Sequence, residues 1–420
     1  MKKILALIMA LAMVLAGCAA PVEEAVVEEA ASEEVAAEEV VAEEAEEGID
    51  WDSMTDEELY EMAKAEGGVI NVYAGSSKMM KTGEAFKEKY PELEVEVYDL
   101  DQDEATAKIK TEYETGNVSA DVLHAKDTAG EIYYDYMPGG YIESYYPADL
   151  CANIDPELLK YGLAFYGSMN LWYYNTKAFP DGCPLDNWWD IVAMNEDGTP
   201  KWNLFTKNLG SETAYLALLG SFTLHPEEMA AAYEEYYGEP ITYTYDGAAV
   251  GVEDGNAGYE FIYRLSQHPA MTFIDDGDEV VQAIHFLYEE SGENGLAFAS
   301  ASKMDNAEDG YNIAWVTDIA PYTAMANCNY MYVISGCDNP AGARLFIRYQ
   351  MSADGFGESF DKLGNWSVDK TYVSEENPFT LAEFAEHEYG CITPDMENLY
   401  KIFLDVQDSW ILWYDQNPNK

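Results

Sequence analysis

The sequence predicts an α/β protein with two lobes, each a mostly parallel β-sheet flanked by helices. Two observations predict this class. About 370 residues, from Gly48 to Lys420, have a globular composition, which is more than one hydrophobic core usually covers. Short β-rich runs also alternate with amphipathic helical stretches from residue 55 onwards. That order is typical of parallel strands joined by helical crossovers.

The first elements are a helix followed by three strands with two helices between them. Thr55-Asp56-Glu57-Glu58 has the capping-box pattern of a helix N-terminus, and Gly67-Gly68 ends that helix. Strands are expected at 69–73, 94–98 and 120–125, and helices at 78–89 and 103–114. In such a sheet, ligands bind beyond the carboxyl ends of the strands.

The middle of the chain and its end predict further elements of both kinds. Asn339-Pro340 begins a helix through Met351, with proline in the tolerated first position. The remaining expectations are strands at 170–174 and 330–335, a short helical turn at 186–191, and helices at 211–221, 254–267 and 277–289.

The N-terminus has the pattern of an export signal. Lys2-Lys3 precedes an uncharged apolar run, Ile4 to Val14, which is too short to cross a bilayer core of about 30 Å. Leu15-Ala16-Gly17-Cys18 follows and resembles a bacterial lipobox. We therefore expect residues 1–17 to be a signal peptide and Cys18 to be lipidated; an ordinary secretory signal is the alternative. Acyl chains on Cys18 would hold the protein on the extracellular face of the cell membrane.

Residues 18–48 are expected to be an acidic spacer that begins with the lipidated cysteine. Residues 19–48 contain twelve Glu, no Lys or Arg, and too little apolar surface for a packed core. The net charge of the chain is -57; without those twelve Glu and Lys2-Lys3 it is about -47. Phosphate binding needs clusters of Lys and Arg, so this charge argues against nucleic acid as a partner.

The cysteine pattern argues against a structural zinc site. None of the five cysteines after Cys18 lies in a C-x-x-C pair or at metal-ligand spacing from a histidine. No metal and no cofactor is therefore expected. Cys328 and Cys337 are the nearest pair in sequence, and the odd count leaves at least one thiol free. The sequence leaves the disulfide state open for Cys151, Cys183, Cys328, Cys337 and Cys391.

Four stretches of sequence, in the same order, are similar to those of one protein family. They are Gly68–Ser77 with Ala85–Pro91, then Ser119–Val122, Tyr173–Lys177 and Asp338–Ile347. The chain thus resembles the extracellular solute-binding lipoproteins of bacterial ABC importers, which have the type II periplasmic-binding-protein fold. The resemblance implies a ligand cleft at a hinge between the two lobes. It places 49–165 and 315–420 in lobe 1 and 166–314 in lobe 2.

Within this family the chain resembles the branch that holds iron(III), thiamine, polyamine and phosphonate binders. Ferric members bind metal through a Tyr-Tyr pair after the second-lobe hinge helix. The comparable stretch here, Ile284–Glu290, has no such pair. The resemblance therefore implies capture of a small polar or cationic solute, with ferric binding as a less favoured alternative, and delivery of the solute to a membrane permease.

Candidate ligand-binding residues are expected where loops lead into helices, because helix N-termini offer free N–H groups to oxygen-bearing ligands. Two acids among the candidates could pair with a cationic group, and two aromatic residues could form a wall. The alternatives are helix N-caps for the serines, solvated acids, and core packing for the aromatic residues. The candidates are Ser76, Ser77, Lys126, Asp127, Thr128, Ser211, Glu212, Trp315 and Tyr322.

No motif in the sequence favours an enzyme. There is no G-x-S-x-G, H-E-x-x-H or P-loop pattern, and the five histidines are scattered. No catalytic residues are expected. Two alternatives to the importer role remain: a lipoprotein that senses a ligand for a membrane kinase, and a secreted acidic hydrolase. The expected partners of the monomer are a small-molecule solute, an ABC permease and, through the anchor, the membrane surface.

Overall fold

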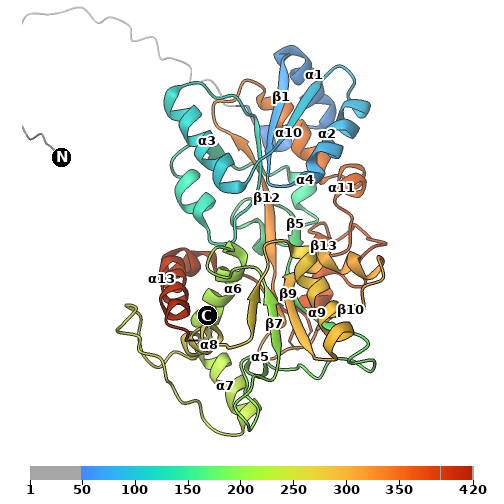
Figure 1. Ribbon diagram of the computed structural model, residues 1–420. Helices are drawn as coiled ribbons and strands as arrows, with labels where there is room; N and C mark the ends of the chain where they lie inside the picture. The colour runs from blue at the N-terminus through green and yellow to red at the C-terminus, as the bar shows by residue number, and fades with distance from the viewer. Residues whose placement is uncertain (1–48, 388, 419–420) are drawn as a thin grey trace, which may run out of the picture. The chain divides into compact units, whose positions relative to one another are not determined.

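A computed structural model describes residues 49–387 and 389–418 of the chain. The predicted signal peptide, the lipidation of Cys18 and the acidic spacer lie outside the described residues. Residues 50–420 form one compact unit. Within it, a seven-stranded and a five-stranded sheet each carry their own helices (Figure 1). We call these the first and the second lobe, and the two-lobed α/β fold predicted from the sequence is confirmed.

The first sheet has the strand order β13-β5-β12-β3-β1-β2, with β4 also paired to β12. Its three parallel strands are the predicted ones, and they run in the predicted direction. The sheet is mixed, and the prediction that it is mostly parallel is wrong. β12 runs antiparallel to β3, β4 and β5, and β13 runs antiparallel to β5. The strands are β1 (Val69–Ala74), β2 (Glu94–Asp99), β3 (Val122–Lys126), β4 (Ile142–Glu143), β5 (Leu163–Ser168), β12 (Asn327–Ile334) and β13 (Asn365–Ser367).

Helices cover both sides of the first sheet. Figure 1 shows α3 on its left and α2 with α11 on its right. The predicted capping box is present at Thr55 and Glu58, where α1 begins. The helical elements are α1 (Asp56–Glu66), α2 (Lys78–Lys89), α3 (Gln102–Thr115), α4 (Ala148–Cys151), α10 (Pro340–Met351) and α11 (Ala353–Ser359), with the short turns η1 (Trp51–Ser53), η2 (Ile132–Tyr136) and η3 (Pro156–Leu159).

The second sheet has the order β10-β6-β9-β7-β8 and is also mixed. β7 runs parallel to β8 and β9, whereas β6 runs antiparallel to β9 and β10. Its strands are β6 (Asn170–Asn175), β7 (Asn203–Thr206), β8 (Met271–Phe273), β9 (Gly295–Ser300) and β10 (Ile313–Trp315). Its helical elements are α5 (Trp188–Ile191), α6 (Thr213–Leu224), α7 (Pro226–Tyr237), α8 (Ala257–Ser266), α9 (Gly277–Ser291) and η4 (Ala301–Ala307).

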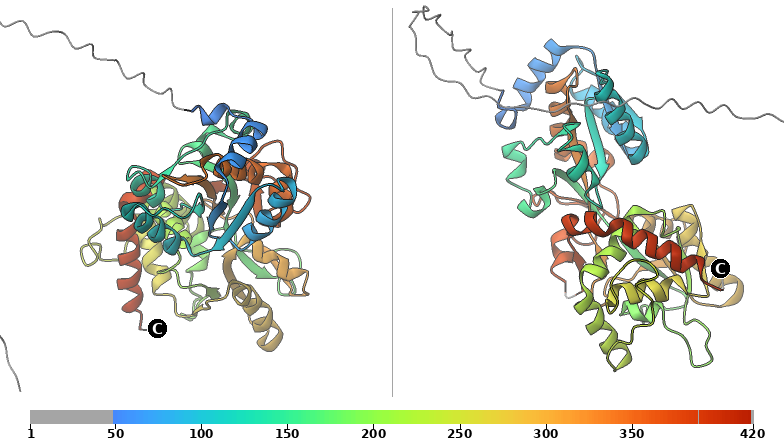
Figure 2. Two further views of the ribbon diagram at one scale, coloured as in Figure 1. Left: turned by 90° about the horizontal axis from the view of Figure 1, so that it is seen from above. Right: turned by 90° about the vertical axis from the view of Figure 1, so that its left-hand side faces the viewer.

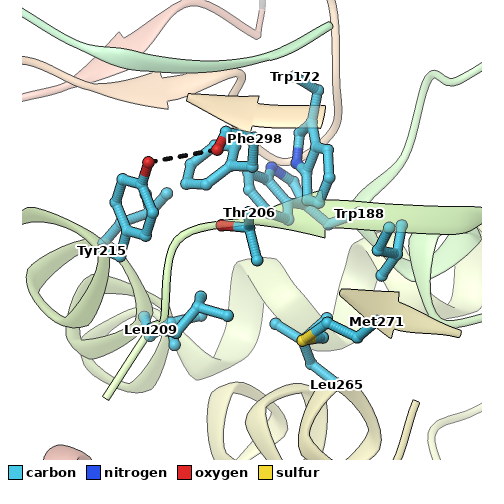
Figure 3. Close-up of a pocket in the computed structure, with 11 residues that line it drawn as sticks. Trp172, Trp188, Thr206, Leu209, Tyr215, Leu265, Met271 and Phe298 are labelled. Carbon is cyan, nitrogen blue, oxygen red and sulfur yellow. Dashed lines mark hydrogen bonds between the residues drawn. The ribbon is translucent and has the colours of Figure 1, made fainter. Parts of the chain in front are cut away.

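The core of the second lobe is packed around aromatic side chains. Trp172 and Trp188 lie 5.8 Å apart between ring centroids, and both face Phe298. The Tyr215 hydroxyl donates to the Phe298 carbonyl oxygen at 3.2 Å (Figure 3). The void among these side chains measures only about 10 Å³. That is at the lower limit for a single water molecule, so this region is a core and not a ligand site.

Three crossings connect the lobes. The chain passes from β5 to β6 through Met169, and from β11 (Ala324–Met325) to β12 through Ala326; both residues are buried. The third crossing leads from β13 through α12 (Leu381–Ala385) to β14 (Cys391–Ile392), which pairs in parallel with β11. Two of the three crossings are therefore direct continuations of sheet strands, which is the arrangement of a hinge.

The C-terminal helix α13 (Met396–Asp415) packs on α6 and α8 of the second lobe. Figure 2 shows it, in red, lying across the green helices of that lobe. Its buried Leu399, Val406 and Trp410 join the same hydrophobic cluster as Trp188. The lobe boundaries expected from the sequence placed 315–420 in lobe 1, and α13 departs from them. An amphipathic pattern predicts that a helix has a buried face, but it does not specify the partner of that face.

All five described cysteines are free thiols. Cys328 lies near the start of β12 and Cys337 beyond its end. A strand rises about 3.3 Å per residue, so the six steps from Cys328 to Ile334 alone span roughly 20 Å. Cys337 lies in the turn beyond Ile334, too far from Cys328 to pair with it. In the described part of the chain, no helix combines the length and the apolar character needed to span a membrane.

Candidate functional site

A hollow of about 220 Å³ lies in the first lobe, where β1, β2 and β3 reach their carboxyl ends. This is where ligands bind in sheets of parallel strands. Hinge strands β5 and β12 contribute to the hollow as well. The lining residues are Gly75, Ser76, Asp99, Leu100, Asp101, Gln102, His124, Lys126, Tyr166 and Asn329.

Three of the lining side chains form a row across the sheet. Asn329 on β12 is the register partner of Lys126 on β3 and of Tyr166 on β5. Directly opposed residues in a sheet project from the same face. The row therefore sets an amide, an ammonium and a phenol side by side in the hollow. Two of its three members stand on strands that cross between the lobes.

Several buried polar atoms in the hollow have no partner. His124 is 1% exposed, and neither Nδ1 nor Nε2 has a hydrogen-bond partner among the described residues. Asn329 is 4% exposed, and its Nδ2 is also unpartnered. Leaving a buried donor or acceptor unsatisfied costs about 1–3 kcal/mol. Such groups are normally paired in folded proteins, so their presence indicates a surface built to contact a ligand or water.

The environment of His124 keeps its imidazole neutral. Burial lowers the pKa of His124 to about 3, and the positive charge of Lys126 acts in the same direction. The ring packs against Phe165, Tyr166 and Phe360. A neutral imidazole offers one N–H donor and one acceptor to the hollow.

Lys126 is partly buried, and its ammonium makes no ion pair with any carboxylate of the described chain within 4.0 Å. Its backbone N–H donates to Gln102 Oε1 at 3.1 Å, which joins the end of β3 to the start of α3. Burial lowers the pKa of the Lys126 ammonium, and the negative charge of Glu212 opposes this effect. The charge of Glu212 in the second lobe therefore acts on Lys126 in the first lobe.

Ser76 and Ser77 lie where β1 leads into α2, as predicted. Ser76 lines the hollow. Ser77 is the N-cap residue of α2, but its side chain makes no capping hydrogen bond and is exposed. In the first turn of α2 the N–H groups of Met79 and Met80 donate to the carbonyl oxygens of Ser76 and Ser77, each at 3.1 Å. This turn carries the positive end of the helix dipole.

Ser211 and Glu212 lie where the second lobe enters α6. The Ser211 hydroxyl donates to the Asn208 carbonyl oxygen at 3.2 Å, and the Lys207 ammonium pairs with Glu212 at 3.1 Å. Gln407 Nε2 on α13 donates to the Gly210 carbonyl oxygen at 3.0 Å. The loop at residues 207–212 is therefore held by its own hydrogen bond and ion pair and by a hydrogen bond from the C-terminal helix.

Only Ser76 and Lys126 of the nine predicted site residues line the hollow. Besides Ser77, Ser211 and Glu212, described above, four more do not line it: Asp127, Thr128, Trp315 and Tyr322. Asp127 is 1% exposed, and its Oδ2 accepts from the Tyr133 N–H at 3.0 Å, which caps η2. Burial raises the pKa of Asp127 to about 6. Thr128 is also buried. Trp315 packs on Trp366 and Phe379, and Tyr322 packs on Phe222 and His225. No sequence pattern distinguished these roles from ligand contact.

Sequence reasoning also missed residues that the fold brings to the hollow. Asp99 and Asp101 flank the end of β2, and a strand end in a parallel sheet was a signal that could have found them. Tyr166 and Asn329 depend on the register of β12 between β3 and β5, which the sequence does not encode locally. The missed residues are Asp99, Asp101, Gln102, His124, Tyr166 and Asn329.

Two other hollows are less suited to a polar ligand. One of about 520 Å³ is lined mainly by the segment from Trp366 to Thr393, and none of its lining residues carries an unpartnered buried polar atom. One of about 500 Å³ lies at the amino ends of β1 and β3. Its buried Asp121 already accepts from the backbone N–H groups of Asn71 and Asn339, at 2.7 and 3.0 Å. The carboxyl-end hollow is therefore the candidate site.

Comparison with known proteins identifies the family. The sequence profile of bacterial extracellular solute-binding proteins matches residues 81–385, which is most of the chain. The chain therefore belongs to this family. Its role is that of the substrate-binding component of an ABC transporter, and it acts outside the cell. No curated protein sequence matches this chain.

Solved structures agree on the fold. Iron-bound HitA from Pseudomonas aeruginosa has a TM-score of 0.56 at 14% identity, over 81% of this chain and 98% of its own. The apo ferric ion-binding protein A of Pasteurella haemolytica has a TM-score of 0.60 at 13% identity, over 83% and 98%. AgtB of Agrobacterium tumefaciens R10, in complex with agropinic acid, has a TM-score of 0.55 at 15% identity, over 83% and 99%. These likenesses establish the type II periplasmic-binding-protein fold.

Proposed function

We propose that this protein captures a small polar solute in the hollow at the carboxyl ends of β1, β2 and β3. The observation that carries this proposal is the set of buried polar atoms without partners on His124 and Asn329. A solute that hydrogen-bonds to them removes the cost of leaving them unsatisfied. Lys126 and Ser76 supply further polar contacts in the same hollow.

Hinge motion would complete the site from the second lobe. The row of Tyr166, Asn329 and Lys126 stands partly on strands that cross between the lobes. Glu212 acts on Lys126 from the entry of α6. Closure of two lobes around a ligand is a common mode of capture, and it buries most of a small solute.

The chemistry of the hollow favours an organic solute over a bare metal ion. The structural neighbours include proteins described as binding iron and agropinic acid. Across residues 49–387 and 389–418, no three His, Cys, Asp or Glu side chains are grouped so that they could hold a metal ion. The unpartnered groups on Lys126 and Asn329 are hydrogen-bond donors, which metal ions do not use.

The proposal extends to location and partners. We propose that Cys18 is lipidated, that residues 18–48 tether a monomeric receptor to the outer face of the membrane, and that the receptor delivers its solute to an ABC permease. The protein catalyses no reaction in this account. Its net charge of -57 supports the absence of a nucleic acid partner.

A thermal-shift screen tests the proposal. The protein used in the screen begins at residue 18 and carries the substitution Cys18→Ser, so that no acyl chain is attached. The panel contains amino acids, polyamines, thiamine, phosphonates, oligosaccharides and ferric citrate. A solute at 100 times its dissociation constant adds about 2.7 kcal/mol to the free energy of unfolding.

Variants of the hollow show where the solute binds. We expect the solute to stabilise His268→Phe as it stabilises the original protein, but not to stabilise Asn329→Leu or His124→Phe. His268 is the matched control because it is a buried histidine in the second lobe. If a solute stabilises Asn329→Leu and His124→Phe as much as the original protein, it binds outside this hollow.

A further inference from the structure

We infer that the captured solute is a zwitterion, with its oxyanion facing Lys126 and its amine facing Asp99 and Asp101. This inference rests on the proposed function of the hollow and narrows the solute to one chemical class. It follows from the distribution of donors, acceptors and charges among the lining residues.

The floor of the hollow presents hydrogen-bond donors. The Lys126 ammonium forms no ion pair within the described residues, and Asn329 Nδ2 is buried without an acceptor. Burial raises the pKa of the Tyr166 phenol, so its hydroxyl keeps its proton. These three groups stand in one row across β5, β12 and β3. A carboxylate or phosphonate has only acceptors, and it forms its strongest hydrogen bonds with a charged donor such as Lys126.

The N-terminus of α2 adds to this preference. The helix has 12 residues, and Ser77 leaves its first turn without a side-chain cap. Ser76, which precedes it, lines the same hollow as Lys126. The positive end of the helix dipole favours a negative group at this point. The buried, unpartnered Asn329 Nδ2 is a donor that lines the same hollow, so the preference does not rest on the helix alone.

The rim of the hollow has the opposite charge. Asp99 ends β2, and Asp101 is the N-cap residue of α3. Both are exposed, and the Asp101 side chain makes no capping hydrogen bond. Among the ion pairs of the described residues, neither carboxylate takes part in one. Two free carboxylates therefore stand in the same hollow as one free ammonium.

Neither a simple anion nor a simple cation satisfies both parts of the hollow. An anion on Lys126 would be repelled by the carboxylates of Asp99 and Asp101, which line the same hollow. A cation between the two aspartates would leave the Lys126 ammonium and the Asn329 amide without an acceptor, and Lys126 would repel it. A solute with separated positive and negative groups pairs both ends.

Matched probes test the inference. Three sets are titrated by isothermal calorimetry into the chain from Cys18 with Cys18→Ser: α- and ω-amino acids of three to six carbons, the corresponding acids without the amine, and the corresponding amines without the carboxylate. We expect binding in the amino-acid set only, or at least tenfold tighter there than in both other sets. Binding of an amine or an acid as tight as that of its amino acid, or no binding in the amino-acid set, overturns the inference.

Charge-specific variants provide the second readout. Lys126→Met is expected to weaken amino-acid binding at least tenfold, and Lys126→Arg to retain most of it. Asp99→Asn and Asp101→Asn together are expected to weaken it at least fivefold. Amino-acid binding that is unchanged in Lys126→Met also overturns the inference. If a solute of another class binds instead and depends on His124 and Asn329, the proposed function stands and only the zwitterion is wrong. If no solute depends on His124 and Asn329, the proposed function fails as well.

Discussion

Asn329 on β12 lies directly opposite Lys126 on β3 in the antiparallel pairing of the first sheet. β12 continues from β11 through Ala326, which is one of the crossings between the lobes. A strand of the hinge therefore also carries a side chain of the candidate site. This relationship gives a direct physical route by which a bound solute and the relative position of the lobes affect one another.

Replacing Asn329 by leucine should remove ligand binding without loss of stability. Asn329 Nδ2 is buried and unpartnered, so an apolar residue of similar size removes a desolvation cost. Asn365→Leu is the matched control in the same sheet, because Asn365 is buried and its Nδ2 donates to the Phe360 carbonyl oxygen at 3.2 Å. Urea unfolding should show Asn365→Leu destabilised by about 1–3 kcal/mol and Asn329→Leu not destabilised. A greater loss of stability in Asn329→Leu than in the control would show that its side chain is satisfied within the fold.

Acid should destabilise the protein partly through His124. Burial holds the pKa of folded His124 at about 3, below its ordinary value of 6.5. Between these values the unfolded chain binds more protons than the folded one, so the free energy of unfolding falls as the pH drops from 6.5 towards 3. His124→Phe should reduce this slope by up to about 1.4 kcal/mol per pH unit. Urea unfolding at pH 7, 6 and 5 measures it, with His387→Gln as an exposed control. If the free energy of unfolding changes with pH equally in His124→Phe and in the original protein, the pKa of His124 is not lowered by folding.

Asp127 should prove to be a structural residue. Its carboxylate caps η2 through the Tyr133 N–H, and it does not line the carboxyl-end hollow. Asp127→Ala should lower stability by about 0.5–2 kcal/mol, as the loss of a cap does. The affinity for the solute found by screening should change less than twofold in calorimetry. A loss of affinity above fivefold would restore the ligand role expected from the sequence.

The C-terminal helix should stabilise the second lobe in particular. Trp410 on α13 is 1% exposed and contacts the loop at Gly210. Trp410→Ala should cost about 3–5 kcal/mol, because it leaves a large cavity. Hydrogen exchange measured by mass spectrometry should show reduced protection in α6 and α8, while β1 and β3 keep theirs. Reduced protection centred on β1 and β3 would instead support the sequence-based placement of residues 315–420 in lobe 1.

Local signals in the sequence were enough for the elements of the first lobe. The capping box at Thr55, the proline at position 340 and the alternating pattern of 94–98 each depend on neighbouring residues, and each corresponds to an observed helix or strand. The positions of the serines at the start of α2 and of Lys126 at the end of β3 were predictable for the same reason, and their role in binding stays a prediction. They follow from the rule that ligands bind where parallel strands end.

The remaining features depend on contacts between residues far apart in the chain. Tyr166 and Asn329 are 163 residues apart, and only the register of β5 and β12 brings them into one row. The place of α13 depends on which apolar surface covers Trp410 and Val406. Trp315 and Tyr322 suit an aromatic wall and a core equally well by type. In the structure they pack on Trp366 and Phe222, and neither lines the carboxyl-end hollow.

The central claim is that the solute is held by the unpartnered side chains of the carboxyl-end hollow. A crystal structure of the protein with the solute identified by screening tests it most directly. The account predicts the solute within hydrogen-bond distance of Lys126 Nζ and Asn329 Nδ2, with the 207–212 loop of the second lobe over it. A solute bound in the hollow beside Trp366, or anywhere that leaves Lys126 and Asn329 without a partner, would contradict it.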